Sequence, residues 1–308
     1  MKIALIGGRS GEVLYKELIK RGYETYLIAG KSEDSGVKIA DKKKIIDLRK
    51  KDEILEYLKE NNIKEIILGT GHIYALNLVK FLKENLINCA INLEAANLCK
   101  DKTKLKLKLE EWGYKTPKYI LKQKNEEIPL EILENVIGYP IVIKSPVDDF
   151  MPCAIYTKKK LKSKLLEIKN KLILFEKCII GNEISVPITN DLEDVRVLGI
   201  MNYSKGKDEK LEGFENMETI NLNREMEKKI VLEFKKLIEK INATGLVRVD
   251  SIVEREEIYI LEINSIIVTG ETNDDYTKIW KEKKMDFPSN LINAQINILN
   301  KLRKKSEK

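Results

Sequence analysis

Short apolar runs alternate with amphipathic segments over the first 95 residues. The runs MKIALIGG, YETYLIAG, KKIIDL and IKEIILGTG fit strands, whereas Val13 to Lys20 and Asp52 to Lys59 carry apolar residues at helical spacing. The first helix ends at Gly22, as expected of a crossover helix that covers a sheet. The pattern predicts an α/β unit with a parallel sheet.

A lysine-rich stretch follows, from residue 96 to residue 175. Leu105, Leu107 and Leu109 alternate with lysines as in a strand, but Leu105, Leu109 and Trp112 also fit a helical stripe that ends at Gly113. Of the two interpretations we favour the helix. The run IVIKS after Pro140 fits a strand, because the residue before a proline is already extended.

The last stretch, residues 176–308, mixes strands and helices. We expect strands at NEISVPI, VRVLGIM, GLVRVDSIV and IYILEINSI, preceded by the run LILFEKCII at the boundary. A helix from Glu225 to Ile241 has a buried stripe, and a terminal helix is expected to begin after Pro288 with Ser289 as its N-cap. The chain therefore divides into three parts, 1–95, 96–175 and 176–308.

Composition excludes several classes of protein. With 308 residues, 43% hydrophobic and 34% charged, the chain can build a core, and it lacks an apolar run of the ~20 residues that a membrane helix needs. The start resembles a strand rather than a signal peptide, so we expect a cytoplasmic protein. The four cysteines form no CxxC, and His72 is the single histidine, which argues against a zinc cluster or a histidine-dependent hydrolase. The net charge of +7 comes from dispersed lysines without interleaved aromatics, so neither a nucleic acid nor a membrane is expected as a partner.

Candidate chemistry lies in the strands GLVRVDSIV and IYILEINSI. Side chains repeat every two residues along a strand, so Arg248 shares a face with Asp250, and Glu262 shares one with Asn264. The short link Glu254–Glu257 makes the two strands antiparallel neighbours. Two carboxylates and an amide oxygen are ligands that Mg²⁺ accepts together with phosphate oxygens. Spacing alone is equally compatible with a plain arginine–carboxylate pair on a solvent face.

The segment RVDSIVEREEIYILEIN resembles the metal-binding strand pair of the ATP-grasp superfamily, whose carboxylate-amine ligases include D-alanine:D-alanine ligase and, more distantly, biotin carboxylase. Other matching parts occur in the family's order: the pair Asp101-Lys102 heads a helix that ends in GYKTP, the strand PIVIK carries Lys144, and LFEKCIIGNEISV follows. The resemblance covers nearly the whole chain and is densest between residues 101 and 264. It implies an ATP-grasp fold of mixed α/β and α+β class, with an N-terminal parallel α/β substrate domain (1–95), a small lid subdomain (96–175) and a large subdomain with the metal site (176–308).

The resemblance also implies roles for individual residues. It places phosphates at Lys102 and Lys144, the adenine base at Glu176, Lys177 and Ile179, the ribose at Glu183, the metal at Asp250, Glu262 and Asn264, and the oxyanion of the reaction at Arg248. The opening GGRSGE is similar to that of the dipeptide ligases, which would make Glu12 an amine-binding residue; on spacing it is also a tight strand-to-helix turn. His72 follows the IKEIILGTG strand, where substrate would approach.

The chain departs from the family pattern in two places. The loop 145–153 contains no glycine, so we expect it, and Phe150 in particular, to select substrate more than to bind phosphate. Residues 265–271, after EIN, replace the usual Pro-Arg or glycine-containing turn, which predicts an unusual acceptor pocket.

The resemblance thus implies an ATP-dependent ligase that uses ATP with Mg²⁺ or Mn²⁺ to join a small, amino-acid-like carboxylate to an amine. Two alternatives stay open: an ATP-grasp kinase or bicarbonate-using carboxylase-type enzyme, and a nucleotide-binding regulatory protein with a degenerate site. The sequence does not determine the oligomeric state, for which a homodimer is one option.

Overall fold

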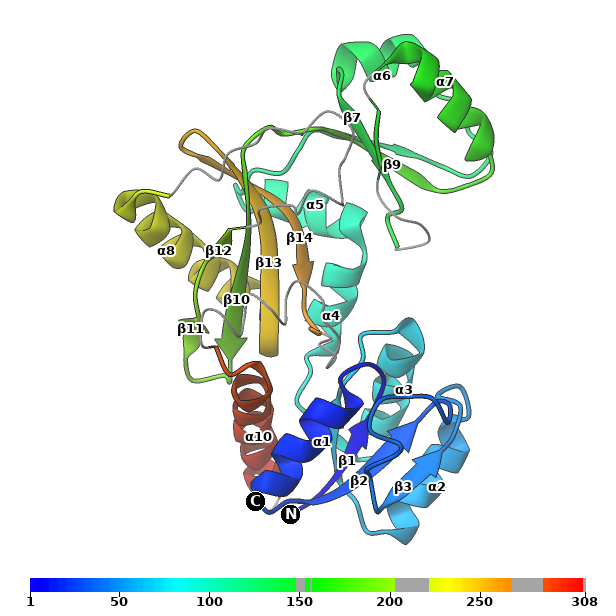
Figure 1. Cartoon of the computed structure of the whole chain (residues 1–308), viewed down its shortest axis with the longest axis vertical. Helices are drawn as coiled ribbons and strands as arrows, with labels where there is room; N and C mark the ends of the chain where they lie inside the picture. The colour runs from blue at the N-terminus through cyan, green and yellow to red at the C-terminus, as the bar shows by residue number, and fades with distance from the viewer. Residues whose placement is uncertain (148–152, 156, 203–221, 268–284, 307–308) are drawn as a thin grey trace.

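The computed structural model describes residues 1–147, 153–155, 157–202, 222–267 and 285–306. Its strands form three sheets, and Figure 1 shows each sheet in a separate part of an elongated molecule. Phe150 of the loop 145–153 and residues 268–271 of the segment 265–271 lie outside the described residues.

The N-terminal domain is a parallel sheet with strand order β3-β2-β1-β4-β5, as the alternating pattern predicted. The strands β1, β2 and β4 are largely buried because helices cover the sheet, which explains their continuous apolar runs, whereas the edge strand β3 is exposed. The elements are β1 Lys2–Ile6, α1 Gly11–Lys20, β2 Glu24–Ala29, β3 Lys43–Ile45, α2 Lys51–Glu60, β4 Glu65–Leu68, α3 Ile73–Glu84 and β5 Asn88–Cys89.

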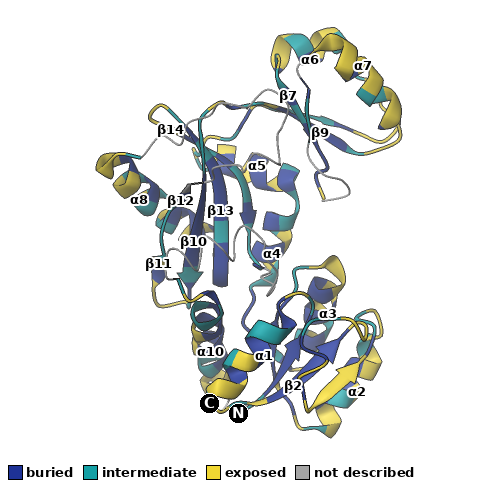
Figure 2. Ribbon diagram, viewed as in Figure 1, coloured by how far each residue is buried: buried dark blue, intermediate teal, exposed yellow. Residues whose placement is uncertain are grey.

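Residues 119–177, for which we keep the name lid, form an antiparallel sheet of order β6-β9-β7-β8 with two helices packed on it. Leu133, Leu161 and Phe175 are completely buried in its core, whereas the outer faces of the helices are exposed (Figure 2). The elements are β6 Tyr119–Lys122, α6 Leu130–Val136, β7 Ile141–Lys144, β8 Cys153–Ile155, α7 Lys158–Glu167 and β9 Ile173–Lys177.

The large subdomain contains the antiparallel sheet β11-β10-β13-β14, with β12 paired to β10. Its apolar face packs on α8, where Ile230, Phe234 and Leu237 are completely buried. The elements are β10 Asn182–Asn190, β11 Val195–Val197, β12 Met201–Asn202, α8 Arg224–Ile241, β13 Gly245–Glu254 and β14 Glu257–Asn264.

Two helices before the lid belong to the core of the large sheet. Helices α4 (Leu93–Lys100) and α5 (Lys102–Glu111) bury Cys99, Leu105 and Leu109 in the same cluster as α8. The helical interpretation of the Leu105–Leu109 region is confirmed. The sequence divided the chain at residues 95 and 175, whereas α4 crosses the first of these positions and β9 crosses the second.

The last helix, α10 (Phe287–Ser306), returns to the N-terminal domain, so both ends of the chain lie together (Figure 1). The prediction that Ser289 caps this helix is wrong. The helix begins earlier, and the carboxylate of Asp286 accepts the backbone N–H of Ser289 at 3.0 Å. Pro288 is tolerated because a first-turn residue needs no N–H partner. No helix in the described part of the chain is long and apolar enough to cross a bilayer.

Candidate active site

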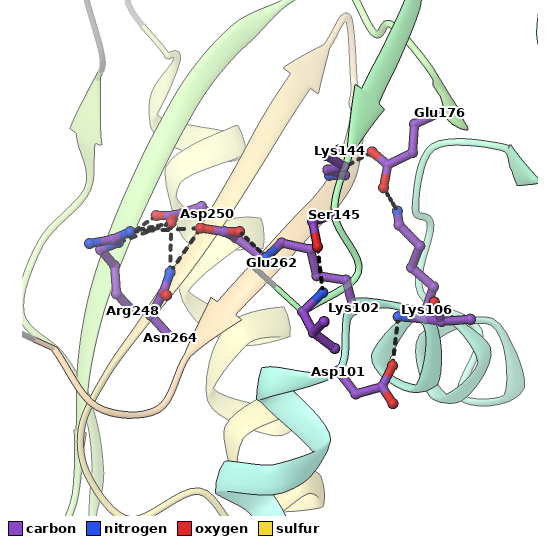
Figure 3. Close-up of polar contacts among 12 residues, drawn as sticks. Asp101, Lys102, Lys106, Lys144, Ser145, Glu176, Arg248, Asp250, Glu262 and Asn264 are labelled. Carbon is purple, nitrogen blue, oxygen red and sulfur yellow. Dashed lines mark hydrogen bonds and ion pairs between the residues drawn. The ribbon is translucent and has the colours of Figure 1, made fainter. Parts of the chain in front are cut away.

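The strands β13 and β14 bring four polar side chains together on one face of the large sheet (Figure 3). Their antiparallel register pairs Arg248 with Asn264 and Asp250 with Glu262, and a bulge follows Asp250. The amide nitrogen of Asn264 donates to Asp250 Oδ2 at 2.9 Å and to Glu262 Oε1 at 3.1 Å. Alternation places all four on the face opposite Val247 and Val249, which are completely buried in the core.

Asp250 holds Arg248 in a fixed plane. The guanidinium donates through Nε to Asp250 Oδ1 at 2.7 Å and through Nη2 to Oδ2 at 2.6 Å, a bidentate pairing that fixes orientation as well as distance. Ser185, on the neighbouring strand β10, donates to Asp250 Oδ1 at 2.6 Å. The side chains of Arg248 and Asp250 are only 15% and 10% exposed, so this is not a pair on a solvent face.

For both Asp250 and Glu262, burial acts to raise the pKa and the neighbouring positive charges act to lower it. Burial raises the pKa of Asp250, although Arg248 and the Ser185 hydroxyl favour its ionised form. Burial also acts to raise the pKa of Glu262, but the nearby cations Lys102, Lys144 and Arg248 together with the Asn264 amide outweigh it and lower that pKa. Glu262 is therefore anionic at neutral pH and faces three positive side chains.

Lys102 reaches this cluster from the start of α5. The carboxylate of Asp101 accepts the backbone N–H groups of Thr103 and Lys104 at 3.1 and 3.0 Å, so Asp101 caps the helix and fixes where it begins. Lys102 Nζ lies 3.7 Å from Glu262 Oε2, and its backbone N–H donates to Pro146 O at 3.1 Å. The first turn of α5 thus joins the loop after β7 to the strand pair.

A second charged cluster lies at the boundary between the lid and the large subdomain (Figure 3). Glu176 on β9 is 2% exposed, and Lys144 Nζ at the end of β7 lies 2.7 Å from its Oε2. Lys106 Nζ lies 3.0 Å from Oε1 of the same carboxylate. Sequence reasoning missed Lys106, because it is one of many lysines in its helix; its signal was the four-residue spacing from Lys102, which puts both on one helical face.

The expected base and ribose positions lie along the crossover from β9 to β10. Lys177 is exposed and its backbone N–H donates to Lys118 O at 2.8 Å, the Ile179 side chain is buried, and Glu183 lies on β10 opposite Ile252. Between them, a Cβ on Gly181 would lie 2.3 Å from the carbonyl oxygen of Val253. This crossover passes β13 too closely for any side chain at residue 181.

A cavity of about 460 Å³ joins the strand pair to the N-terminal domain. His72 lines it, and its Nδ1 accepts the backbone N–H of Tyr74 at 3.3 Å, which caps α3. Glu12 does not line it, and its carboxylate pairs with Lys16 at 2.6 Å. The charged and polar lining residues are Arg9, Thr70, His72, Lys100, Lys102, Arg248, Glu262, Asn264 and Ser265.

The strand-pair residues fit a magnesium or manganese ion. The side chain of Asn264 lies within hydrogen-bond distance of both Asp250 and Glu262, and each of the three carries an oxygen of the kind that these cations prefer. The Asn264 amide now faces the carboxylates through its nitrogen, so its oxygen would have to turn toward the ion. Within the described ranges no group of three or more acidic, histidine or cysteine side chains forms a complete metal site. Two carboxylates and an amide would leave coordination positions for phosphate oxygens and water, as is usual for Mg²⁺ beside a nucleotide.

Comparison with known proteins agrees with this geometry. A family model described as "ATP-grasp domain" matches residues 99–270, more than half of the chain. The chain belongs to the ATP-grasp family. This ATP-grasp chain also has the family's fold: it superposes on the D-alanine–D-alanine ligase of Bacillus anthracis, whose structure holds ATP, with a TM-score of 0.74 over 99% of both chains at 22% identity. It matches N5-carboxyaminoimidazole synthetase from Staphylococcus aureus, solved with ADP, with a TM-score of 0.71 over 90% of this chain and 73% of that one at 17% identity.

Curated relatives of the ATP-grasp chain are longer proteins. Carbamoyl phosphate synthase large chains from Clostridium botulinum and a Thermotoga species are 25% and 23% identical to it, over 81% and 80% of its length. The chain spans about a quarter of their length, 24% and 23%. The expected fold and family are confirmed, and at the level of the family so is the expectation of an ATP-dependent enzyme that uses Mg²⁺ or Mn²⁺.

Proposed function

We propose that this chain is an ATP-dependent ligase that activates a small, amino-acid-like carboxylate as an acyl phosphate and joins it to an amine. The observation that carries the proposal is the cavity of about 460 Å³, which has Arg248 and Asn264 of the strand pair at one end and the N-terminal loops with Arg9 and His72 at the other. A phosphoryl group held at the strand pair would face directly into space large enough for a small substrate.

The buried cations and carboxylates support a nucleotide site beside this cavity. Lys102 and Lys144 would hold phosphates, because each is a buried lysine close to a carboxylate and to the cavity or the lid. Glu176, Lys177 and Ile179 would line the base, and Glu183 would bind the ribose. Asp250, Glu262 and Asn264 would hold Mg²⁺ or Mn²⁺, which when bound neutralises charge that develops on the phosphates.

The remaining steps are assigned to this chain's own side chains. A carboxylate oxygen of the substrate attacks the γ-phosphorus and ADP leaves; the amine nitrogen then attacks the acyl carbon, and phosphate leaves. Arg248, kept in plane by Asp250, would stabilise the oxyanion that forms on the acyl oxygen. His72 would contact the substrate in the cavity. Glu12 would bind an amine only after exchanging its partner Lys16.

The test is a reaction with carboxylates labelled with ¹⁸O. The purified chain is mixed with Mg-ATP and a panel of amino-acid-like carboxylates, with and without amines, and ADP release and the label in phosphate are measured. A ligase transfers one ¹⁸O from carboxylate to phosphate and requires the amine for sustained turnover. A stable phosphorylated product would identify a kinase, turnover with bicarbonate a carboxylase-type enzyme, and ATP binding without turnover a regulatory protein; each would overturn the proposal.

A further inference from the structure

Lys106 is among the largest completely buried side chains of the described residues, and it carries a charge. Three groups surround its ammonium: Glu176 Oε1 at 3.0 Å, the hydroxyl oxygen of Thr116 at 2.6 Å, and the ring of Tyr119 with its centroid at 5.4 Å. Thr116 donates its own proton to Ile260 O at 2.9 Å, so its hydroxyl accepts from Lys106. Each of these contacts stabilises the ammonium where it lies.

The cluster around Glu176 has an excess of positive charge. Lys106 and Lys144 share one carboxylate, and all three side chains are at most 9% exposed. Burial and the repulsion by Lys144 lower the pKa of Lys106 to about 8, against the attraction of Glu176. A buried excess of cations is costly until an anion arrives, and a phosphate group is such an anion.

The two lysines differ in how firmly they are held. Lys106 has the threonine hydroxyl and the aromatic ring besides Glu176, and its side chain is only 1% exposed. Lys144 stands at the end of β7, is 9% exposed, and its charge also acts on Glu262 in the strand pair. Lys144 therefore lies between the two clusters, whereas Lys106 lies behind Glu176.

We propose that Lys106 is the permanent counter-ion of Glu176, which allows Lys144 to leave that carboxylate for a phosphate group of the bound nucleotide. Lys106 is then a positioning residue: it touches no phosphate, but it keeps Glu176 neutralised once Lys144 has moved. Without Lys106, departure of Lys144 would leave a buried, unpaired carboxylate, so Lys144 would stay on Glu176. This inference rests on the proposed nucleotide site.

The contacts of Lys106 also connect it to both sides of the lid boundary. Glu176 belongs to the lid sheet through β9, whereas Thr116 is bonded to β14 of the large sheet. Backbone bonding reinforces this link, since Ile260 N donates to Lys115 O at 2.9 Å. Lys106 thus fixes the carboxylate of the lid relative to the strand that carries Glu262.

The experiment measures dissociation constants for ATP and for adenosine by calorimetry or competition in the presence of Mg²⁺. Lys106→Met should weaken ATP binding roughly tenfold or more, because Lys144 then stays on Glu176 and the phosphate loses its charged partner, while adenosine binding changes less than about twofold. Lys108→Met is the matched control, because this lysine of the same helix is exposed and pairs with Glu111, and it should leave both constants unchanged.

A double variant separates charge from structure. In the Glu176→Gln background no carboxylate needs a counter-ion, so adding Lys106→Met should not weaken ATP binding further. Neither Glu176→Gln nor the double variant contains the carboxylate of residue 176, so these two proteins can be compared even if Lys106→Met alone folds poorly. Equal weakening of ATP and adenosine by Lys106→Met, or further loss of ATP binding in the double variant, would overturn the inference. If the unaltered chain binds no ATP, the proposed function itself fails.

Discussion

At the scale of single residues, the buried charges of the candidate site share their partners instead of forming exclusive pairs. Asp250 is shared by Arg248, Ser185 and Asn264, and Glu176 is shared by two lysines. Shared partners keep buried charges ionised while leaving some contacts exchangeable. A site that must accept a triphosphate and a cation needs this property, because both arrive with charges that displace existing pairs.

Glu262 offers a direct test of the metal assignment. Glu262→Gln keeps the size and the Asn264 contact but removes the negative charge, so the cation should bind more weakly. We expect the Mg²⁺ concentration for half-maximal ATP turnover to rise roughly tenfold or more, the effect of about 1.4 kcal/mol of lost binding free energy. Titration of ATP turnover with Mg²⁺ measures this concentration.

Glu257→Gln is the control for this variant, since Glu257 is exposed at the far end of the same strand. Unchanged Mg²⁺ dependence in Glu262→Gln would remove Glu262 from the metal site.

Sequence reasoning found residues whose neighbours form a recognisable pattern. The expected meeting of two carboxylates with an arginine and an amide is seen in the register, which pairs Arg248 with Asn264 and Asp250 with Glu262. Strand alternation determines the face of each side chain, and the short link determines the partner strand. Lys106 was missed because its four-residue spacing from Lys102 indicates only a shared helical face, whereas burial of that face depends on the sheet against which the helix packs.

At the scale of elements, the connection from β9 to β10 positions the residues proposed to bind the nucleotide more tightly than a flexible linker would. The backbone at Gly181 passes so close to Val253 that a methyl group at residue 181 would require backbone movement. Glu183 then enters β10 in register with Ile252. The segment that would bind base and ribose is therefore held against the large sheet.

Gly181→Ala should move this crossover without removing any charge. The expected result is weaker binding of ATP and adenosine by similar factors, because the strain of about 1–3 kcal/mol falls on residues that contact the nucleoside. Gly30→Ala is the control: its Cβ would approach no atom nearer than 3.5 Å. The same binding measurements serve as readout. Loss of ATP binding with adenosine unaffected would mean that this crossover contacts phosphates rather than the nucleoside.

Element boundaries illustrate where sequence patterns stop being informative. Both Asp286 and Ser289 are good N-cap residues, and Pro288 is compatible with either start, so the pattern did not distinguish them. Packing distinguishes them, because Phe287 is only 3% exposed and belongs to the core of the N-terminal domain. The first turn of α10 therefore begins at Phe287. The bulge after Asp250 is likewise invisible in the alternating pattern.

At the scale of the whole molecule, α10 holds the two ends of the active site together. Its apolar face packs with Ile3 and Leu5 of the N-terminal sheet and also with Leu246 of the large sheet, within one core cluster. Arg21, the residue that follows α1, donates to Ser289 Oγ at 2.6 Å and adds a polar contact to the same interface. The cavity is lined by residues of the N-terminal domain and of the strand pair, so we expect its width to depend on the helix that packs on both.

Ile292→Ala should therefore destabilise the protein and alter substrate binding at a distance from the site. Ile292 is completely buried in that cluster, and truncation of such a side chain costs about 2–5 kcal/mol of the free energy of unfolding. Denaturant titration measures this loss. Below the unfolding transition the Michaelis constant for the carboxylate should rise while ATP affinity stays within about twofold, because the proposed nucleotide site lies between the lid and the large sheet. Lys304→Ala, on the exposed side of the same helix, should change neither quantity. If Ile292→Ala weakened ATP and carboxylate equally, α10 would support the large sheet as a whole rather than the distance between it and the N-terminal domain.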